Sequence, residues 1–171
     1  MFSILHFRKE LSAPPVAADA PGIQVRQLQV PEDIAAWLAL RDRAMANQTP
    51  AVRSWSADDF HLEMLDKTWW RSDRSWVAVS SSSGSGPEVV GAVSLALREG
   101  LSGTVPVVHW LLVDPAFRRR GVARLLMSYL ERTAWADGWR EVQLETHVGW
   151  ESAVAFYQSI GYAALGDRSP R

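Results

Sequence analysis

Residues 111–126 read LLVDPAFRRRGVARLL, and this stretch decides the fold. The apolar run ends at Asp114-Pro115, a short basic turn follows, and Gly121 opens a segment whose apolar residues have helical spacing. The pattern predicts a strand, a turn and the start of a helix.

This predicted helix start is suited to binding an anion. The first backbone N–H groups of a helix have no partner inside it, and the aligned peptide dipoles add partial positive charge there. A diphosphate fits such a place, with arginine side chains around it. Gly121 lets the backbone approach a ligand that a Cβ would block, and the small Ala123 does nearly the same.

Two motifs in order point to a known family. The spacing Arg-x-x-Gly-x-Ala, formed by Arg118, Gly121 and Ala123, resembles the acetyl-coenzyme A signature of the GCN5-related N-acetyltransferase (GNAT) family. Residues 153–162 read AVAFYQSIGY and resemble that family's second motif. One predicted helix and one predicted strand separate the two, as the family requires. The resemblance implies an enzyme that moves an acetyl group from its co-substrate acetyl-CoA to a primary amine.

Composition narrows the function further. The chain has 171 residues, 47% of them hydrophobic, which suits one globular domain. Its 18 basic and 19 acidic residues give a net charge of −1, which argues against a nucleic-acid partner. The absence of cysteine excludes an acyl-cysteine intermediate, so transfer should be direct, in a ternary complex. The four histidines show no metal-ligand spacing, and we expect no metal.

The start of the chain is predicted to lie outside the fold. Residues 12–22 are small and proline-rich, which is typical of a linker. We therefore expect a flexible N-terminal extension over residues 1–22 and an N-acetyltransferase domain over residues 23–171. No apolar stretch reaches the length of a membrane span, and residues 1–11 lack a signal-peptide core, so we expect no membrane partner and a cytoplasmic protein.

The periodicity predicts a mixed α/β fold. The order of the predicted elements is also that of the family, so the resemblance implies the acyl-CoA N-acyltransferase (GNAT) fold, with a six-to-seven-stranded sheet and helices on both faces. The predicted strands cover residues 23–29, 76–79, 89–97, 105–113, 141–148 and 162–165. The predicted helices begin at Pro31 and Ser56 and cover residues 121–136 and 151–160. The family usually ends in a further strand, for which residues 166–171 leave no room. We expect a partner chain, as in a homodimer, or the N-terminal extension to cover that edge.

The resemblance assigns the acetyl-CoA site. It places the diphosphate on the amides of residues 119–124 and the pantetheine arm beside the strand at residues 111–113. Trp150 stands where the family usually has asparagine, so either another group holds that arm or Trp150 shapes the acceptor pocket. The predicted CoA-binding residues are Leu111, Leu112, Val113, Arg118, Arg119, Arg120, Gly121, Val122, Ala123, Arg124, Trp150 and Tyr157.

Three residues are candidates for catalysis. Tyr157 matches the family tyrosine that acts as general acid towards the CoA sulfur, although a core aromatic would have the same spacing. Glu145 matches the base of the ribosomal-protein branch, and His109 matches a proton relay of the arylalkylamine branch. Either one is equally compatible with a structural role, and we favour Glu145 slightly.

The acceptor stays open between amino acids, polyamines, antibiotics, arylalkylamines and protein N-termini. Trp55, Trp69 and Trp70 either line an aromatic slot for it or pack the second helix onto the sheet. Two other functions also stay open: a catalytically silent CoA-binding sensor or interaction module of the same fold, and a nucleotide-binding module, which fits Arg118–Gly121 but not the Tyr157 motif.

Overall fold

The computed structural model describes residues 3–82, 84–100 and 103–166. The strands are β1 (Ile4–Glu10), β2 (Ile23–Gln27), β3 (Ser75–Ser80), β4 (Glu88–Gly100), β5 (Gly103–Val113), β6 (Glu141–His147) and β7 (Ala163–Ala164). The helices are α1 (Ile34–Met45), α2 (Ala57–Phe60), α3 (Val122–Ala136) and α4 (Glu151–Ser159). A π-helical turn over His61–Leu65 continues α2, which begins at the predicted cap, Ser56.

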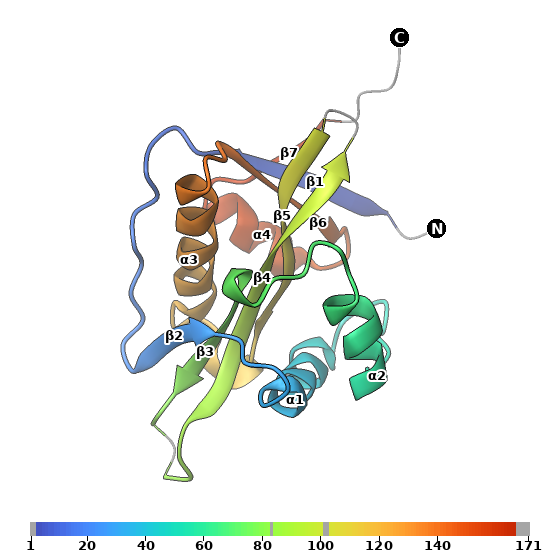
Figure 1. The fold of residues 1–171 in the computed structure, drawn as a ribbon, viewed down its shortest axis with the longest axis vertical. Coiled ribbons are helices and arrows are strands. Elements are labelled where there is room, and N and C mark those ends of the chain that lie inside the picture. The colour runs from blue at the N-terminus through green and yellow to red at the C-terminus, as the bar shows by residue number, and fades with distance from the viewer. Residues whose placement is uncertain (1–2, 83, 101–102, 167–171) are drawn as a thin grey trace.

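The strands form one mixed sheet (Figure 1). Within the described residues it has seven strands in the order β2-β3-β4-β5-β6-β1-β7. The pairing is antiparallel between neighbours except for β5 and β6, which run parallel across the α3 crossover. The predicted mixed sheet with helices on both faces is confirmed.

Two hydrophobic clusters cover the two faces of the sheet. One joins α3 and α4 to the sheet through residues such as Leu126, Leu130 and Leu144. The other joins α1 and α2 to the opposite face through residues such as Trp37, Phe60 and Leu112. Because successive strand residues point to opposite faces, β4 contributes Ala92 to the second cluster and Val93 to the first.

The N-terminal segment differs from the prediction. Residues 4–10 are not a flexible extension, because β1 pairs antiparallel with β6 and with β7. Phe7 is 1% exposed and belongs to the cluster that joins α3 and α4 to the sheet, the α3-side cluster. The link from β1 to β2 then runs around the outside of α3 (Figure 1). The N-terminal segment therefore lies inside the sheet, between β6 and β7.

Candidate active site

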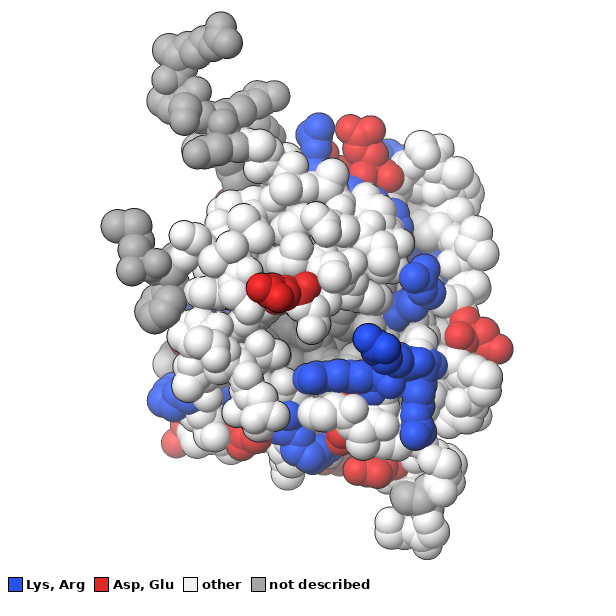
Figure 2. Space-filling model, turned by 180° about the vertical axis from the view of Figure 1, so that it is seen from behind, with Lys and Arg blue, Asp and Glu red and all other residues white. Residues whose placement is uncertain are grey.

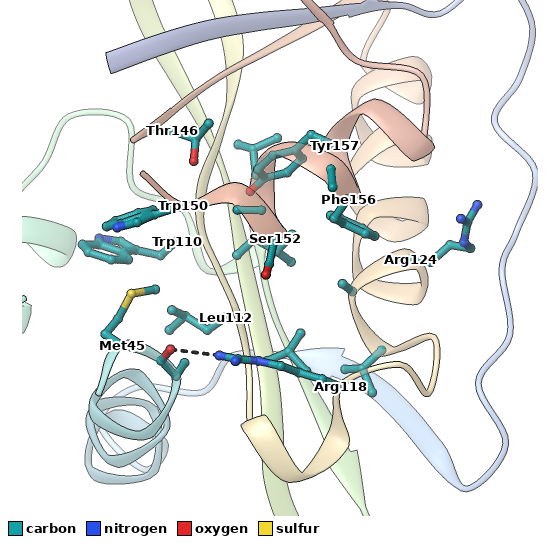
Figure 3. A pocket seen from close by; sticks show the side chains of 18 of the residues that line it. Met45, Trp110, Leu112, Arg118, Arg124, Thr146, Trp150, Ser152, Phe156 and Tyr157 are labelled. Atoms are coloured by element: carbon teal, nitrogen blue, oxygen red, sulfur yellow. Dashed lines mark hydrogen bonds between the residues drawn. The ribbon is translucent and has the colours of Figure 1, made fainter. Parts of the chain in front are cut away.

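The cleft of the molecule lies where two parallel strands part. β5 and β6 share a single bridge, between Val107 and Gln143, and then diverge. The gap is a cleft of about 1150 Å³ walled by β5, the start of α3, the end of β6 and α4 (Figure 3). The predicted residues that line it are His109, Leu111, Leu112, Val113, Arg118, Arg119, Gly121, Val122, Ala123, Arg124, Glu145, Trp150 and Tyr157. The structure thus brings together residues that lie up to 48 positions apart, from His109 to Tyr157.

An irregularity in β5 shapes the middle of the cleft. Ala92 pairs with Leu112 and Ser94 pairs with His109, so Trp110 and Leu111 both face Val93. Trp110 has φ 50, a left-handed backbone that is rare for a bulky residue. The resulting bulge turns β5 away from its ladder beside the cleft.

The start of α3 presents backbone N–H groups at one end of the cleft. Leu125 N donates to Gly121 O over 2.9 Å, so the N–H groups of Val122, Ala123 and Arg124 precede the helical bonding. Arg119 has φ 62 and Gly121 has φ 80, a backbone that gathers successive N–H groups around an anion. Figure 2 shows basic side chains gathered beside a hollow on one face of the molecule.

Three details at this end differ from the prediction. A Cβ on Gly121 would meet Asp19 O at 3.6 Å and Ala20 Cβ at 3.7 Å, so the glycine is needed for its backbone angle rather than for room beside a ligand. The Arg118 side chain donates to Ala44 O over 3.0 Å and ties the turn to the end of α1 (Figure 3). Arg120 does not line the described cleft, and its guanidinium lies 5.0 Å from the centre of the Phe117 ring.

His109 is held in a state that does not suit a base. Arg98 Nη2 donates to His109 Nδ1 over 2.9 Å, and because arginine only donates, Nδ1 accepts. Burial, with the charges of Arg98 and Lys67, lowers the pKa of His109 to about 3. The neutral ring therefore carries its proton on Nε2, which is buried and has no partner among the described residues.

Glu145 is the other candidate base, and it lies on the opposite wall. Its side chain is half exposed, with Oε2 4.0 Å from Arg98 Nη1 and Oε1 3.5 Å from His6 Nδ1 on β1. These distances make loose contacts between accessible groups, which contribute little to stability. Glu145 is thus a carboxylate that a ligand in the cleft can reach.

Tyr157 lies on α4 and points into the cleft (Figure 3). Its ring also packs in the α3-side cluster, 5.5 Å from Phe156 and 5.9 Å from Tyr162 between ring centres. Burial raises the pKa of the Tyr157 hydroxyl above its usual range. The hydroxyl therefore stays protonated at neutral pH and can donate a hydrogen bond.

Comparison with known proteins agrees with this geometry. The model of the Acetyltransferase (GNAT) family matches residues 35–162. This chain is a member of that family. A mycothiol acetyltransferase of Thermobispora bispora is 27% identical over 161 residues, which cover 94% of this chain and 53% of that protein. The chain thus spans about half the length of the curated relatives that it matches across its length.

Solved structures share the fold. A GCN5-related N-acetyltransferase from Sphaerobacter thermophilus has a TM-score of 0.77 at 19% identity, over 96% of this chain and 49% of that one. The aminoglycoside N-acetyltransferase AAC(6')-Iy in complex with CoA has a TM-score of 0.61 at 20% identity, over 85% of this chain and 90% of that one.

In this GNAT chain, Trp150 lies at the beginning of α4 and lines the cleft. Its Nε1 is buried and has no hydrogen-bond partner among the described residues. Buried donors are rarely left unpaired, so this N–H is available to a ligand in the cleft. Trp110 lines the same region, and the buried Arg41 guanidinium stacks on it at 4.5 Å and on Trp55 at 4.2 Å.

The three tryptophans proposed from the sequence to form an aromatic slot pack in the core and do not line the cleft. Trp55, Trp69 and Trp70 belong to the α1 and α2 cluster and are absent from the described lining of the cleft. Trp55 lies 5.3 Å from Trp110, and Trp69 lies 4.5 Å from His109, measured between ring centres. Trp55 and Trp69 therefore contact residues that line the GNAT cleft without lining it themselves.

Sequence reasoning missed Arg98, which joins both candidate bases. Arg98 lies two positions from the end of β4 and directly after the predicted strand, which ended at residue 97. Extending the strand's alternation from Ser94 would have placed Arg98 on the face of His109. Met45, Gln48 and Thr146 also line the cleft and carry no local signal.

Two kinds of feature are absent from the described residues. No helix among them is long and apolar enough to cross a membrane. The same part of the chain holds no group of three or more histidine, cysteine, aspartate or glutamate residues able to bind a metal ion.

Proposed function

We propose that this GNAT chain is an acetyl-CoA-dependent N-acetyltransferase that transfers the acetyl group directly to a primary amine. One observation carries the proposal: the cleft between the diverging β5 and β6 has a protonated tyrosine, Tyr157, on α4 and a reachable carboxylate, Glu145, on β6. An acid and a base that flank one gap are what amine acylation requires.

The residues of the cleft fit acetyl-CoA. The N–H groups of Val122, Ala123 and Arg124 suit its diphosphate, and the edge of β5 at residues 111–113 suits its amide-bearing arm. The buried Trp150 Nε1 supplies a donor where the family's asparagine usually stands. The bound thioester supplies the acetyl group.

The cleft's own residues then divide the proton steps. Glu145 takes a proton from the ammonium, directly or through a water, and the free amine attacks the acetyl carbonyl. The C–N bond forms, the C–S bond breaks, and Tyr157 gives its proton to the departing thiolate. The second proton that the nitrogen loses passes through water to the Tyr157 oxygen, which restores the hydroxyl. His109 takes no part in proton transfer, because its Nδ1 is engaged by Arg98.

The experiment is acetyl transfer by the full chain from acetyl-CoA to the five acceptor classes left open by the sequence. Free thiol and the acetylated product are both measured, the product by mass spectrometry. We expect thiol release to require one of the amines and to equal the amount of product. Calorimetric binding of CoA without transfer to any amine would indicate the silent CoA-binding module instead. Absence of both binding and transfer would overturn the proposal.

A further inference from the structure

We infer that the acceptor is an amine with a carboxylate beside its amino group, as in a free α-amino acid, and that Arg98 binds this carboxylate. The inference rests on the proposed function and names the substrate class of the same cleft.

Arg98 is an arginine whose donors are mostly unused. It lines the cleft from the end of β4, and its side chain is 37% exposed. A guanidinium has five N–H donors. Among the described residues, its partners are His109 Nδ1 at 2.9 Å and Glu145 at 4.0 Å. Most of its donors are therefore left for solvent or for a ligand.

The position of Arg98 is fixed by a supporting shell. The acceptor that holds it, His109, is partly buried, and the Trp69 ring lies 4.5 Å from the imidazole. A guanidinium anchored through one N–H still has an edge that can bind a carboxylate with two parallel hydrogen bonds. The anchor thus places a carboxylate-binding group at the cleft rather than on a freely moving side chain.

The neighbouring Glu145 supplies the opposite charge. The two side chains are accessible and 4.0 Å apart, so their mutual attraction is weak enough for a ligand to replace it. An α-amino acid carries an ammonium and a carboxylate on one carbon, and these two charges match the pair. Binding the carboxylate to Arg98 leaves the ammonium beside Glu145, the proposed base.

The charge of the cleft also disfavours polycations. The acidic residues that line it are Glu145 and Glu151, against the arginines Arg98, Arg118, Arg119 and Arg124. Lys67 lies close enough to His109 to lower its pKa. A polyamine or an aminoglycoside needs several carboxylates, and these walls offer few.

The test compares matched acceptors at saturating acetyl-CoA. The panel contains the common L-amino acids, the corresponding amino acid amides, which lack the carboxylate, and spermidine. We expect at least one amino acid to exceed its amide by about 10- to 100-fold in kcat/KM, the effect of one charge-assisted contact. Arg98→Gln should raise KM for that amino acid by a similar factor and change KM for the amide little. Arg98→Lys should recover part of the loss.

Arg8→Gln is the matched control. Arg8 is an exposed arginine on β1 that contacts Glu141 and does not line the cleft, so its loss should leave the preference unchanged. Calorimetric CoA affinity equal to that of the parent shows that Arg98→Gln has folded.

Two outcomes separate the two proposals. Equal use of amides and amino acids, with no effect of Arg98→Gln, would overturn the inference and leave N-acetyltransfer standing. Transfer to no amine would overturn the proposed function. In that case the role of Arg98 is tested by measuring the affinity of the CoA-bound protein for amino acids. Equal affinity in the parent and in Arg98→Gln would reject that role.

Discussion

Burial changes the pKa values of two residues in the cleft in opposite directions. Burial raises the pKa of Tyr157, whereas burial and nearby cations lower that of His109 to about 3. At neutral pH both side chains are therefore uncharged, one as an O–H donor and the other as an acceptor for Arg98. Glu145, by contrast, is half exposed and lies 4.0 Å from Arg98. These states distinguish the candidate acid from the candidate bases in a way that residue spacing could not.

Replacing the candidate acid tests its role directly. Tyr157→Phe keeps the ring in its packing but removes the proton that we assign to the departing thiolate. We expect turnover to fall about 100-fold, within the range of one acid–base group. CoA affinity should change little, and calorimetry checks it. A rate equal to the parent's at every pH would return Tyr157 to a purely structural role.

The choice of base is tested by the dependence of rate on pH. A histidine with an ordinary pKa would give an acidic limb near ~6.5. His109 is neutral well below that pH, so we expect His109→Gln to leave the acidic limb in place. Glu145→Gln should remove the limb and lower the rate about 100-fold or more. The assignment is wrong if His109→Gln removes the limb and Glu145→Gln keeps it.

At the scale of the elements, the strand–turn–helix unit was predictable because its signals are local. The apolar strand, Asp114-Pro115 and Gly121 follow one another in the chain. β5 ends at Val113 and α3 ends at Ala136, as predicted, although β5 begins earlier, at Gly103, and α3 begins at Val122. The bulge at Trp110 was not predictable, because it depends on the register between β4 and β5. Arg98 was missed for the same reason. Pairing across strands, rather than any local pattern, brings Arg98 near His109.

The helix start gives a prediction with a matched glycine. Gly121 and Gly138 lie at opposite ends of α3, with φ of 80 and 92. Valine is strained at such angles and should destabilise both ends alike. Only Gly121→Val should disturb the N–H groups of the anion site, and we expect CoA affinity to fall at least about tenfold, or 1.4 kcal/mol. Arg119→Ala should cost less, because it removes one side chain and leaves the amides. Calorimetric titration of CoA into Gly121→Val, Gly138→Val and Arg119→Ala checks the order of their affinities. Unchanged CoA affinity in Gly121→Val would reject the anion site at the start of α3.

At the scale of the whole molecule, His109 links the cleft to the acid stability of the fold. In the unfolded chain a histidine takes up a proton near pH ~6.5, whereas folded His109 does so only at about pH 3. Between these values the unfolded state binds the extra proton, so the free energy of unfolding falls as the pH falls. We expect melting temperatures to drop less between pH 7 and pH 5 in His109→Gln than in the parent. Equal drops would show that His109 is as easily protonated in the folded protein as in the unfolded one.

The place of the N-terminus in the sheet is the part of the fold that sequence reasoning placed wrongly. The proline-rich residues 12–22 read as a boundary, and β1 shows little alternation because Phe7 is its one buried residue among those described. The pairing partners of β1, which are β6 and β7, lie more than 130 residues further along the chain. No local pattern reports such a pairing, and the strand's contribution to the fold shows only in its contacts.

Those contacts make the strand a structural part of the domain rather than an appendage. Phe7 is 1% exposed and packs in the α3-side cluster, and Lys9 Nζ lies 2.9 Å from Oε2 of the buried Glu131 on α3.

Phe7→Ala should lower the free energy of unfolding by about 3–5 kcal/mol, the usual cost of such a cavity. Val16→Ala is the control, because Val16 is 88% exposed in the following link and should change stability by less than about 0.5 kcal/mol. Urea denaturation measures both, and Phe7→Leu, at a smaller expected cost, gives a value if Phe7→Ala does not fold. Equal stability of Phe7→Ala, Phe7→Leu and the parent would mean that residues 4–10 do not belong to the sheet in solution. A Phe7 side chain that is already in water fills no space in the core, so shortening it would create no cavity.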